Sequence, residues 1–269
     1  MVCIKKVKIW RESGKIIRNF RFVLLSFITV FLIISTFGCI SSPSGPTGQF
    51  PRKVLIESLG IEYMDYLLFL PSDYYKEKTK NWPMILFLHG AGERGGNVEM
   101  LREVGVPKLA EEDKDFPFIV VSPLCPADRY WVPAVLKKLL DDVCGELRVD
   151  MDRIYLTGLS MGGYGTWDTA IKYPDIFAAI APICGGGNPY WVYKLSDMPV
   201  WVFHGAQDTV VSPQESIKMV EALEKYGGNV KFTLYPELEH DCWTETYNNP
   251  ELYEWFLEQS KANRQRAGI

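Results

Sequence analysis

The sequence predicts an α/β fold in which a mostly parallel sheet of about eight strands carries helices on both faces. Short apolar runs, too short for helices, alternate along the chain with amphipathic helical patterns. Strands that are apolar at almost every position are buried on both faces and are typical of parallel sheets. No repeat and no linker interrupts residues 52–269, so we expect a single domain there.

The expected strands begin with two neighbouring runs, 54–58 and 61–70. The second run alternates polar and apolar residues and then becomes wholly apolar, as a strand does on entering a sheet. Six further apolar runs follow, at 84–88, 118–121, 154–158, 177–183, 200–203 and 230–235. Helical patterns are expected at 98–111, 132–147, 162–173, 213–226 and 250–261.

The first forty residues differ in composition from the rest of the chain. Residues 1–21 carry seven Lys or Arg and one acid, and residues 22–38 carry no charge. A basic flank before an apolar run is the pattern of a secretory signal or a membrane anchor. Gly38 and Cys39 follow, and then a stretch rich in Ser, Pro and Gly. We expect 1–39 to be a signal or anchor segment and 40–51 a flexible linker.

Two outcomes stay open for this segment. It resembles a lipoprotein signal, in which Cys39 is lipidated and becomes the mature N-terminus. Alternatively, the 19 uncharged residues 22–40 form an uncleaved anchor, since a helix of that length spans about 28 Å, close to a bilayer core. Both outcomes place the domain outside the cytoplasm and attach it to the membrane, whereas cleavage without lipidation gives a secreted protein.

The chain beyond the basic segment is acidic. The whole protein has a net charge of −4, and since residues 1–21 contribute +6, the part from Cys39 onward carries −10. Such a domain repels phosphate backbones and anionic lipid heads, which excludes nucleic acid as a partner. The oligomeric state stays open.

Four cysteines follow Cys39, at positions 125, 144, 184 and 242. In an exported domain they permit two disulfides with three possible pairings, and buried free thiols are an equal alternative. The cysteines lack the Cys/His spacing of a zinc site, so we expect no metal, and nothing in the sequence calls for another cofactor.

The strongest chemical signal is the sequence Gly-Leu-Ser-Met-Gly at 158–162, which lies between an expected strand and an expected helix. A sharp strand-to-helix turn needs glycines on both sides of the serine. The turn places Ser160 above the carboxyl edge of the sheet, at a helix N-terminus whose dipole favours a developing anion. We therefore expect Ser160 to be a nucleophile; the alternative is a helix N-cap serine in a Gly-rich turn.

A serine nucleophile needs a base and a group that orients the base. Of the three histidines, His89 and His204 each end an apolar strand in a His-Gly pair, so we expect both to be structural. His240 lies in a polar loop between the last strand and the last helix and is the expected base. Asp208 follows the strand at 200–203 on the same edge and is the expected orienting carboxylate. Three rival carboxylates follow no strand end: Asp197, Glu239 and Asp241.

The segments 88–95, 152–167, 202–208 and 240–243 together resemble the α/β-hydrolase superfamily. More narrowly, they resemble serine esterases of the phospholipase/carboxylesterase and feruloyl-esterase type, some of which are labelled predicted peptidases. The chain order Ser160, Asp208, His240 is the order found in this fold. The resemblance implies an α/β-hydrolase domain in which these residues are nucleophile, orienting carboxylate, and general base and acid, acting on a small-molecule ester.

The resemblance also indicates how substrate is held. Two backbone N–H groups are expected to bind the oxyanion, those of Met161 and Ala91, with Gly92 as the next choice. Only 16 residues separate the strands at 177–183 and 200–203, too few for a large cap domain. Three loop tryptophans are candidates for an acyl or aryl platform, although core packing is the commoner role of each: Trp131, Trp191 and Trp243.

The function that we expect is a carboxylic ester hydrolase with an acyl-enzyme intermediate, acting on short-chain or aryl esters of the acetyl or feruloyl type. A serine peptidase of the prolyl-oligopeptidase type uses the same three residues and is the first alternative. An acyltransferase is a second. A catalytically inactive binding module on the same fold is a third, of a different class.

Overall fold

The computed structural model describes residues 45–58 and 60–267 of the chain. The expected signal or anchor segment 1–39, with Cys39, lies outside the described residues. Within the described ranges, no helix is both long and apolar enough to cross a membrane.

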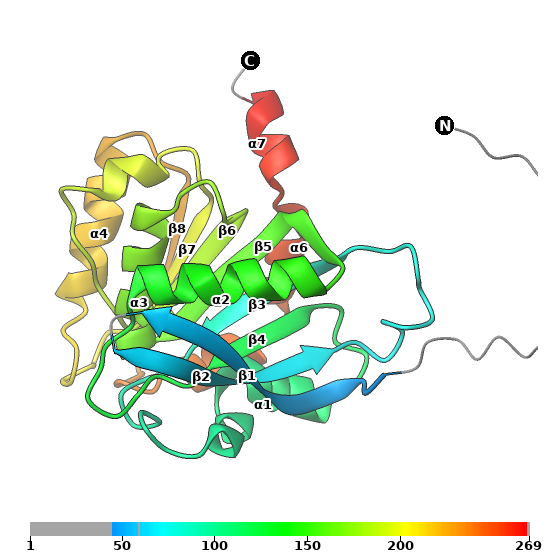
Figure 1. Ribbon diagram of the computed structural model, residues 1–269. Helices are drawn as coiled ribbons and strands as arrows, with labels where there is room; N and C mark the ends of the chain where they lie inside the picture. The colour runs from blue at the N-terminus through cyan, green and yellow to red at the C-terminus, as the bar shows by residue number, and fades with distance from the viewer. Residues whose placement is uncertain (1–44, 59, 268–269) are drawn as a thin grey trace, which may run out of the picture. The chain divides into compact units, whose positions relative to one another are not determined.

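The domain is built on one eight-stranded sheet (Figure 1). The strands are β1 (Gly48–Ser58), β2 (Ile61–Leu70), β3 (Trp82–Leu88), β4 (Ile119–Pro123), β5 (Val149–Leu159), β6 (Ala179–Ile183), β7 (Val200–Gly205) and β8 (Val230–Tyr235). Their order across the sheet is β1-β2-β4-β3-β5-β6-β7-β8. β2 runs antiparallel to β1 and β4, and all other pairs are parallel. The expected mostly parallel sheet of about eight strands is confirmed.

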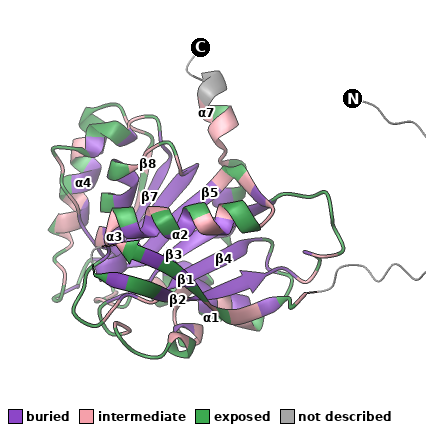
Figure 2. Cartoon of the chain, viewed as in Figure 1, coloured by how far each residue is buried: buried purple, intermediate pink, exposed green. Residues whose placement is uncertain are grey.

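Helices cover both faces of the sheet, as expected. They are α1 (Gly105–Glu112), α2 (Pro133–Glu146), α3 (Met161–Lys172), α4 (Gln214–Lys225), α5 (Trp243–Asn248), α6 (Pro250–Glu258) and α7 (Lys261–Ala267), with the short 3₁₀ helices η1 (Val98–Glu103) and η2 (Val192–Leu195). Apolar side chains of α2, α3 and α4 pack on one face. Those of α1, α5 and α6 pack on the other. The strands β3, β4, β6 and β7 between them are buried along their whole length (Figure 2).

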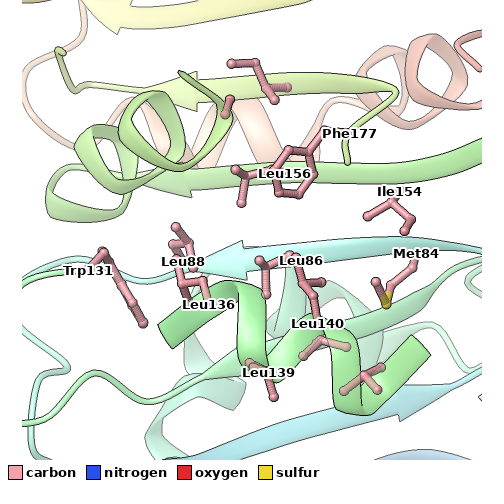
Figure 3. Packing of buried hydrophobic residues seen from close by; sticks show 14 of the residues in the cluster. Met84, Leu86, Leu88, Trp131, Leu136, Leu139, Leu140, Ile154, Leu156 and Phe177 are labelled. Carbon is pink, nitrogen blue, oxygen red and sulfur yellow. The ribbon is translucent and has the colours of Figure 1, made fainter. Parts of the chain in front are cut away.

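The central strand β3 shows why this sequence forms a two-faced sheet. All seven of its residues are buried. Met84, Leu86 and Leu88 point to the face covered by α2, where they lie near Leu136 and Leu140 of that helix (Figure 3). The residues between them, 85 and 87, belong to the cluster on the opposite face. Because side chains alternate along a strand, an uninterrupted apolar run serves two cores at once.

The first strand begins earlier than the sequence indicates. β1 starts at Gly48, so residues 48–51, expected as the end of a flexible linker, pair with β2. The Gln49 side chain also donates to the Pro107 carbonyl of α1. This pairing uses backbone groups at the edge of the sheet and needs no alternation of apolar side chains. The hydrophobic pattern therefore missed it.

Two expected helices are each divided in the structure. The pattern at 98–111 becomes η1 and α1, which are separated at Val104 and Gly105. Gly105 has a φ of +60°, and a Cβ at this position would lie 2.4 Å from the Phe87 ring, so only glycine fits. The pattern at 250–261 becomes α6 and α7, and the short helix α5 precedes them where a loop was expected. Apolar periodicity continued across these breaks and hid them.

Helix α3 approaches the sheet closely because its first turn contains glycine. A Cβ on Gly162 would lie 2.0 Å from the backbone oxygen of Leu88, at the end of β3. The neighbouring backbone cannot yield as a flexible side chain would. The closeness of this contact fixes the position of the residue that precedes α3, which is Ser160.

We predict that Gly162→Ala lowers the free energy of unfolding by about 2 kcal/mol or more, because the added methyl group meets backbone. The matched control is Gly145→Ala in α2, where an added Cβ has no neighbour within 4 Å. This substitution should raise the free energy of unfolding by about 0.5–1 kcal/mol through helix propensity. Urea denaturation followed by circular dichroism measures both. Equal effects of the two substitutions would show that the approach of α3 to β3 is not tight.

Candidate active site

Ser160 occupies a strained turn between β5 and α3. Its φ of 52° and ψ of −116° lie outside the regions that non-glycine residues favour. Its backbone N–H points to the Ile183 carbonyl at 3.0 Å and to the Cys184 Sγ at 3.3 Å. The end of β6 thus stabilises the strained backbone of Ser160 through its N–H group. The side chain of Ser160 takes no part in this support and can contact other groups.

Three side chains from separate loops meet at the carboxyl edge of the sheet. His240 Nε2 lies 3.0 Å from Ser160 Oγ, and His240 Nδ1 lies 2.7 Å from Asp208 Oδ2. Ser160 follows β5, Asp208 follows β7, and His240 follows β8. Since the carboxylate only accepts, Nδ1 carries the proton and donates it to Asp208. Nε2 is then free to accept the hydroxyl proton of Ser160.

The environment of Asp208 keeps its carboxyl group ionised. Burial alone raises the pKa of a carboxyl group, but hydrogen bonds from His240 and from the backbone N–H groups of Val211 and Val210 outweigh it, so the pKa of Asp208 lies below its ordinary value. Both backbone groups donate to Oδ1 at 2.9 Å. The three rival carboxylates of the sequence make no such contact with His240; Asp241, for example, accepts from the backbone N–H of Thr244 at the start of α5.

The loop after β3 lies beside Ser160. A Cβ at Gly90 would be 3.7 Å from the Cβ of Ser160, which places the following residue, Ala91, at the edge of the site. Gly92 is exposed, and a Cβ there would meet nothing within 4 Å. Met161 is the first residue of α3, so its N–H belongs to the helix turn whose donors have no partner within the helix. The two expected oxyanion donors, Ala91 and Met161, thus flank Ser160.

Trp131 is buried and supports this loop from beneath. Only 6% of the residue is exposed, and its indole N–H donates to the His89 carbonyl at 3.1 Å. Trp131 therefore has the packing role that the sequence favours for each of the three tryptophans. Trp243 is half-buried, and its ring lies edge-on to His240 at 5.2 Å. Trp191, by contrast, is 49% exposed.

The four described cysteines are free thiols, and three of them are buried. Burial raises the pKa of Cys125 to about 11 and that of Cys144 to about 11. Burial, together with the neighbouring Cys242, also raises the pKa of Cys184. Thiols that stay protonated at neutral pH are poor nucleophiles, so none of these three competes with Ser160. Among residues 45–58 and 60–267, no cluster of three side chains is arranged to hold a metal ion.

Two polar residues near the triad were missed as functional candidates. His204, expected to be structural, lies with its Nε2 3.1 Å from Asp208 Oδ2. The thiol of Cys184 lies under the Ser160 N–H. The spacing of His204 and Asp208, four residues apart across the end of a strand, is the signal that could have revealed the first contact.

A second hollow lies at the opposite edge of the sheet. It has a volume of about 900 Å³ and contains three basic and three acidic side chains: Lys194, Lys261, Arg264, Asp152, Asp175 and Asp197. None of the triad residues lines it. With no serine–histidine pair within it, this groove does not compete with the triad as the centre of the chemistry.

Comparison with known proteins agrees with this architecture. The profile of the Dienelactone hydrolase family matches residues 132–264, just under half of the chain. A crystal structure of a thermostable esterase superposes with a TM-score of 0.69 at 32% sequence identity, covering 80% of this chain and 64% of the esterase.

Two curated proteins are similar over shorter stretches. The poly(3-hydroxyalkanoate) depolymerase C of Paucimonas lemoignei is 27% identical, over 35% of this chain and 30% of its own length. The bifunctional acetylxylan esterase/xylanase of Neocallimastix patriciarum is 33% identical, over 33% of this chain and 12% of its own length. The chain thus spans less than a third of either relative. Together with the order of the eight strands, the matches show that the chain has the α/β-hydrolase fold.

Proposed function

We propose that the chain is a serine carboxylic ester hydrolase that works through an acyl-enzyme on short-chain or aryl esters. The observation that carries the proposal is the continuous hydrogen-bonded chain from Ser160 through His240 to Asp208. A single histidine or carboxylate near a serine is common, but a strained serine joined to both in this order is the arrangement of a nucleophile with its base. The esterases and hydrolases that the chain resembles support the same reaction class.

In the first half of the reaction, His240 Nε2 takes the proton of Ser160 as Oγ attacks the ester carbonyl carbon. The carbonyl oxygen becomes an anion, which the N–H groups of Met161 and Ala91 stabilise. His240 then gives its proton to the alcohol oxygen, the carbon–oxygen bond breaks, and the alcohol leaves. In the second half, His240 Nε2 takes a proton from water as the water oxygen attacks the acyl carbon. His240 then returns the proton to Ser160 Oγ as the bond between Oγ and the acyl carbon breaks and the acid leaves.

Asp208 contributes by charge and by orientation. Its carboxylate holds the Nδ1 proton of His240 in place, so Nε2 is the atom that faces Ser160. When the ring becomes an imidazolium in the transition state, the adjacent negative charge stabilises it. Asp208 itself does not take the proton, which agrees with a pKa held below its ordinary value.

The surroundings of the triad favour small acyl groups. Between β6 and β7 the chain forms only the short helix η2, so no cap encloses a long acyl chain there. Trp243 offers a half-buried ring beside His240, suited to an aryl or short acyl group. By their names, one relative acts on poly(3-hydroxyalkanoate) and another on acetylated xylan, and the acetyl group of the second is small.

We predict that Ser160→Ala lowers ester hydrolysis by about 10⁴-fold or more, because no other described group can form the acyl-enzyme. Covalent labelling by a fluorophosphonate probe should be lost as well. Labelling is read on a gel after incubation of each purified variant with the probe.

The matched control is Ser72→Ala. Ser72 follows β2 and hydrogen-bonds Asp115, and the antiparallel register places it at the edge of the sheet opposite to Ser160. This variant should label and hydrolyse as the unchanged protein does. Labelling that persists in Ser160→Ala, with circular dichroism showing a folded protein, would move the nucleophile elsewhere.

We predict that hydrolysis of p-nitrophenyl esters falls steeply from acetate to palmitate, with kcat/KM for the two differing by at least about tenfold. Methyl ferulate should be hydrolysed, and a peptide amide should not, because the amine is a poorer leaving group. Comparable rates on amide and ester would favour the serine peptidase alternative. If the protein hydrolyses none of these substrates and is not labelled by the fluorophosphonate probe, the inactive binding module is favoured.

We also propose that the domain is held at the outer side of a membrane through a lipid on Cys39. The basic flank, the uncharged run and the Gly38-Cys39 pair support this location. Cys39→Ala should abolish incorporation of a clickable palmitate analogue in cells, whether or not the uncharged run 22–40 stays attached. Cys3→Ala, which changes a cysteine in the basic flank, should leave the incorporation unchanged. Incorporation that persists in Cys39→Ala would contradict the lipid anchor.

A further inference from the structure

The carboxylate of Asp208 contacts a second imidazole, which the mechanism above does not use. His204 is the second-last residue of strand β7, and its Nε2 lies 3.1 Å from Asp208 Oδ2. The same oxygen accepts from His240 Nδ1 at 2.7 Å. The side chains of His204 and Asp208 are both completely buried. One carboxylate oxygen is therefore shared between two histidines, and only one of them reaches Ser160.

The neighbours of His204 determine where its proton lies. Nε2 is also 3.0 Å from the Val211 carbonyl oxygen. A carboxylate and a carbonyl only accept, so Nε2 must carry a proton and donate to both. Burial lowers the pKa of His204, although its contacts with Val211 and Asp208 act in the opposite direction. Burial therefore favours the neutral ring, in which Nε2 donates and Nδ1 accepts.

The other ring nitrogen of His204, Nδ1, lies beside a buried serine. Ser216 Oγ, in α4, lies 2.7 Å from His204 Nδ1 and 2.9 Å from the Gly185 carbonyl oxygen. The hydroxyl has one proton and can donate it to only one of the two at a time. Gly185 follows Cys184, whose thiol lies under the Ser160 N–H. Polar contacts thus connect Asp208 to His204, His204 to Ser216, and Ser216 to Gly185, in the loop that also contacts the Ser160 N–H.

With His204 included, Asp208 has four donors. The N–H groups of Val210 and Val211 donate to Oδ1, and the two imidazoles donate to Oδ2. The backbone donors fix one oxygen, and His204 fixes the plane of the carboxylate at the other. A donor on Oδ2 also draws negative charge from the oxygen that faces His240.

We propose that His204 is a positioning residue of the triad: as a neutral Nε2–H donor, it fixes the Asp208 carboxylate and moderates the charge that Asp208 presents to His240. The negative charge that His240 faces is therefore smaller than that of an unshared carboxylate, and removal of the His204 donor should increase it. The inference deepens the proposed function and rests on it for its kinetic consequence, but not for the hydrogen bonds themselves.

Other ionisable groups face this cluster and must stay constant in a test of pH dependence. Tyr164 of α3, with Glu215 of α4 behind it, and Cys184 of the loop after β6 face Asp208; Cys242 lies on the loop of His240. Burial raises the pKa of Tyr164 and of Cys184. Neither group therefore gains charge near neutral pH, and a change in the titration of His240 on substitution of His204 reports on Asp208.

Two substitutions of His204 separate its two nitrogens. Gln places its amide nitrogen near the position of Nε2 and retains a donor to Asp208. Asn reaches only the position of Nδ1, so it keeps a polar group beside Ser216 and removes the donor to Asp208. His89→Asn is the matched control, because His89 is also a buried histidine at a strand end, but its Nε2 accepts from Cys125 N–H and does not contact Asp208.

The chain has only three histidines, so ¹⁵N-histidine NMR resolves each ring without a substrate. In the unchanged protein, His204 should show the neutral Nε2–H tautomer at neutral pH. In His204→Asn, the midpoint of the His240 titration should move upward by about 0.5 to 1 pH unit, and His204→Gln should restore most of the shift. His89→Asn should leave the midpoint unchanged.

Kinetics give a second readout. The acid limb of kcat/KM should move with the NMR midpoint, and kcat of His204→Asn should fall by about tenfold with KM nearly unchanged, because a positioning residue does not touch substrate. His204→Gln should recover most of this loss. His89→Asn can change kcat because His89 precedes the loop after β3, but it should leave the midpoint of the acid limb unchanged.

A purely structural His204 predicts a lower rate in His204→Asn with the His240 midpoint where it was, and that result would overturn the inference. An Nδ1–H tautomer or an imidazolium at His204 in the unchanged protein would overturn it without any variant, which covers the case in which His204→Asn does not fold. If the unchanged protein neither hydrolyses esters nor labels with the fluorophosphonate, the proposed function fails, while the tautomer and the NMR midpoints still decide the inference.

Discussion

A buried negative charge with a complete set of donors holds the active edge of this domain together. Removing an ionised carboxylate from water is costly unless hydrogen bonds replace its hydration, and Asp208 is almost fully buried. Its donors are His204 at the end of β7, the backbone N–H groups of Val210 and Val211, and His240 in the loop after β8. Satisfying this carboxylate therefore fixes the relative positions of two loops, and the imidazole of His240 is aimed at Ser160 as a result.

The parallel sheet makes this arrangement possible. β5, β6, β7 and β8 lie side by side, so the residues that follow them emerge at one edge although they are far apart in sequence. The strained turn at Ser160 raises its hydroxyl to the level of the loops, and the glycine-containing first turn of α3 lets the helix lie close enough to β3 to hold the turn there. Packing on both faces of the sheet, by α2 to α4 and by α1, α5 and α6, supports the backbone against that strain.

The fold and the three central residues could be predicted from the sequence because each has a local signal. Ser160 has glycines on both sides between a strand and a helix, and Asp208 and His240 follow strands at one edge. The contact of His204 with the carboxylate has a weaker signal, the four-residue spacing to Asp208, because a His-Gly pair at a strand end is also compatible with simple core packing. The inward position of Trp131 depends on the path of a loop. The backbone pairing of residues 48–51 leaves no hydrophobic pattern to read.

The short connection between β6 and β7 has a consequence for the way in which a substrate reaches Ser160. In the described part of the chain, this connection forms η2 and no lid that must open before binding. On the proposed function, an ester with a large alcohol part can therefore present its acyl group to Ser160 while the rest of the molecule stays in solvent, because this connection does not have to move first.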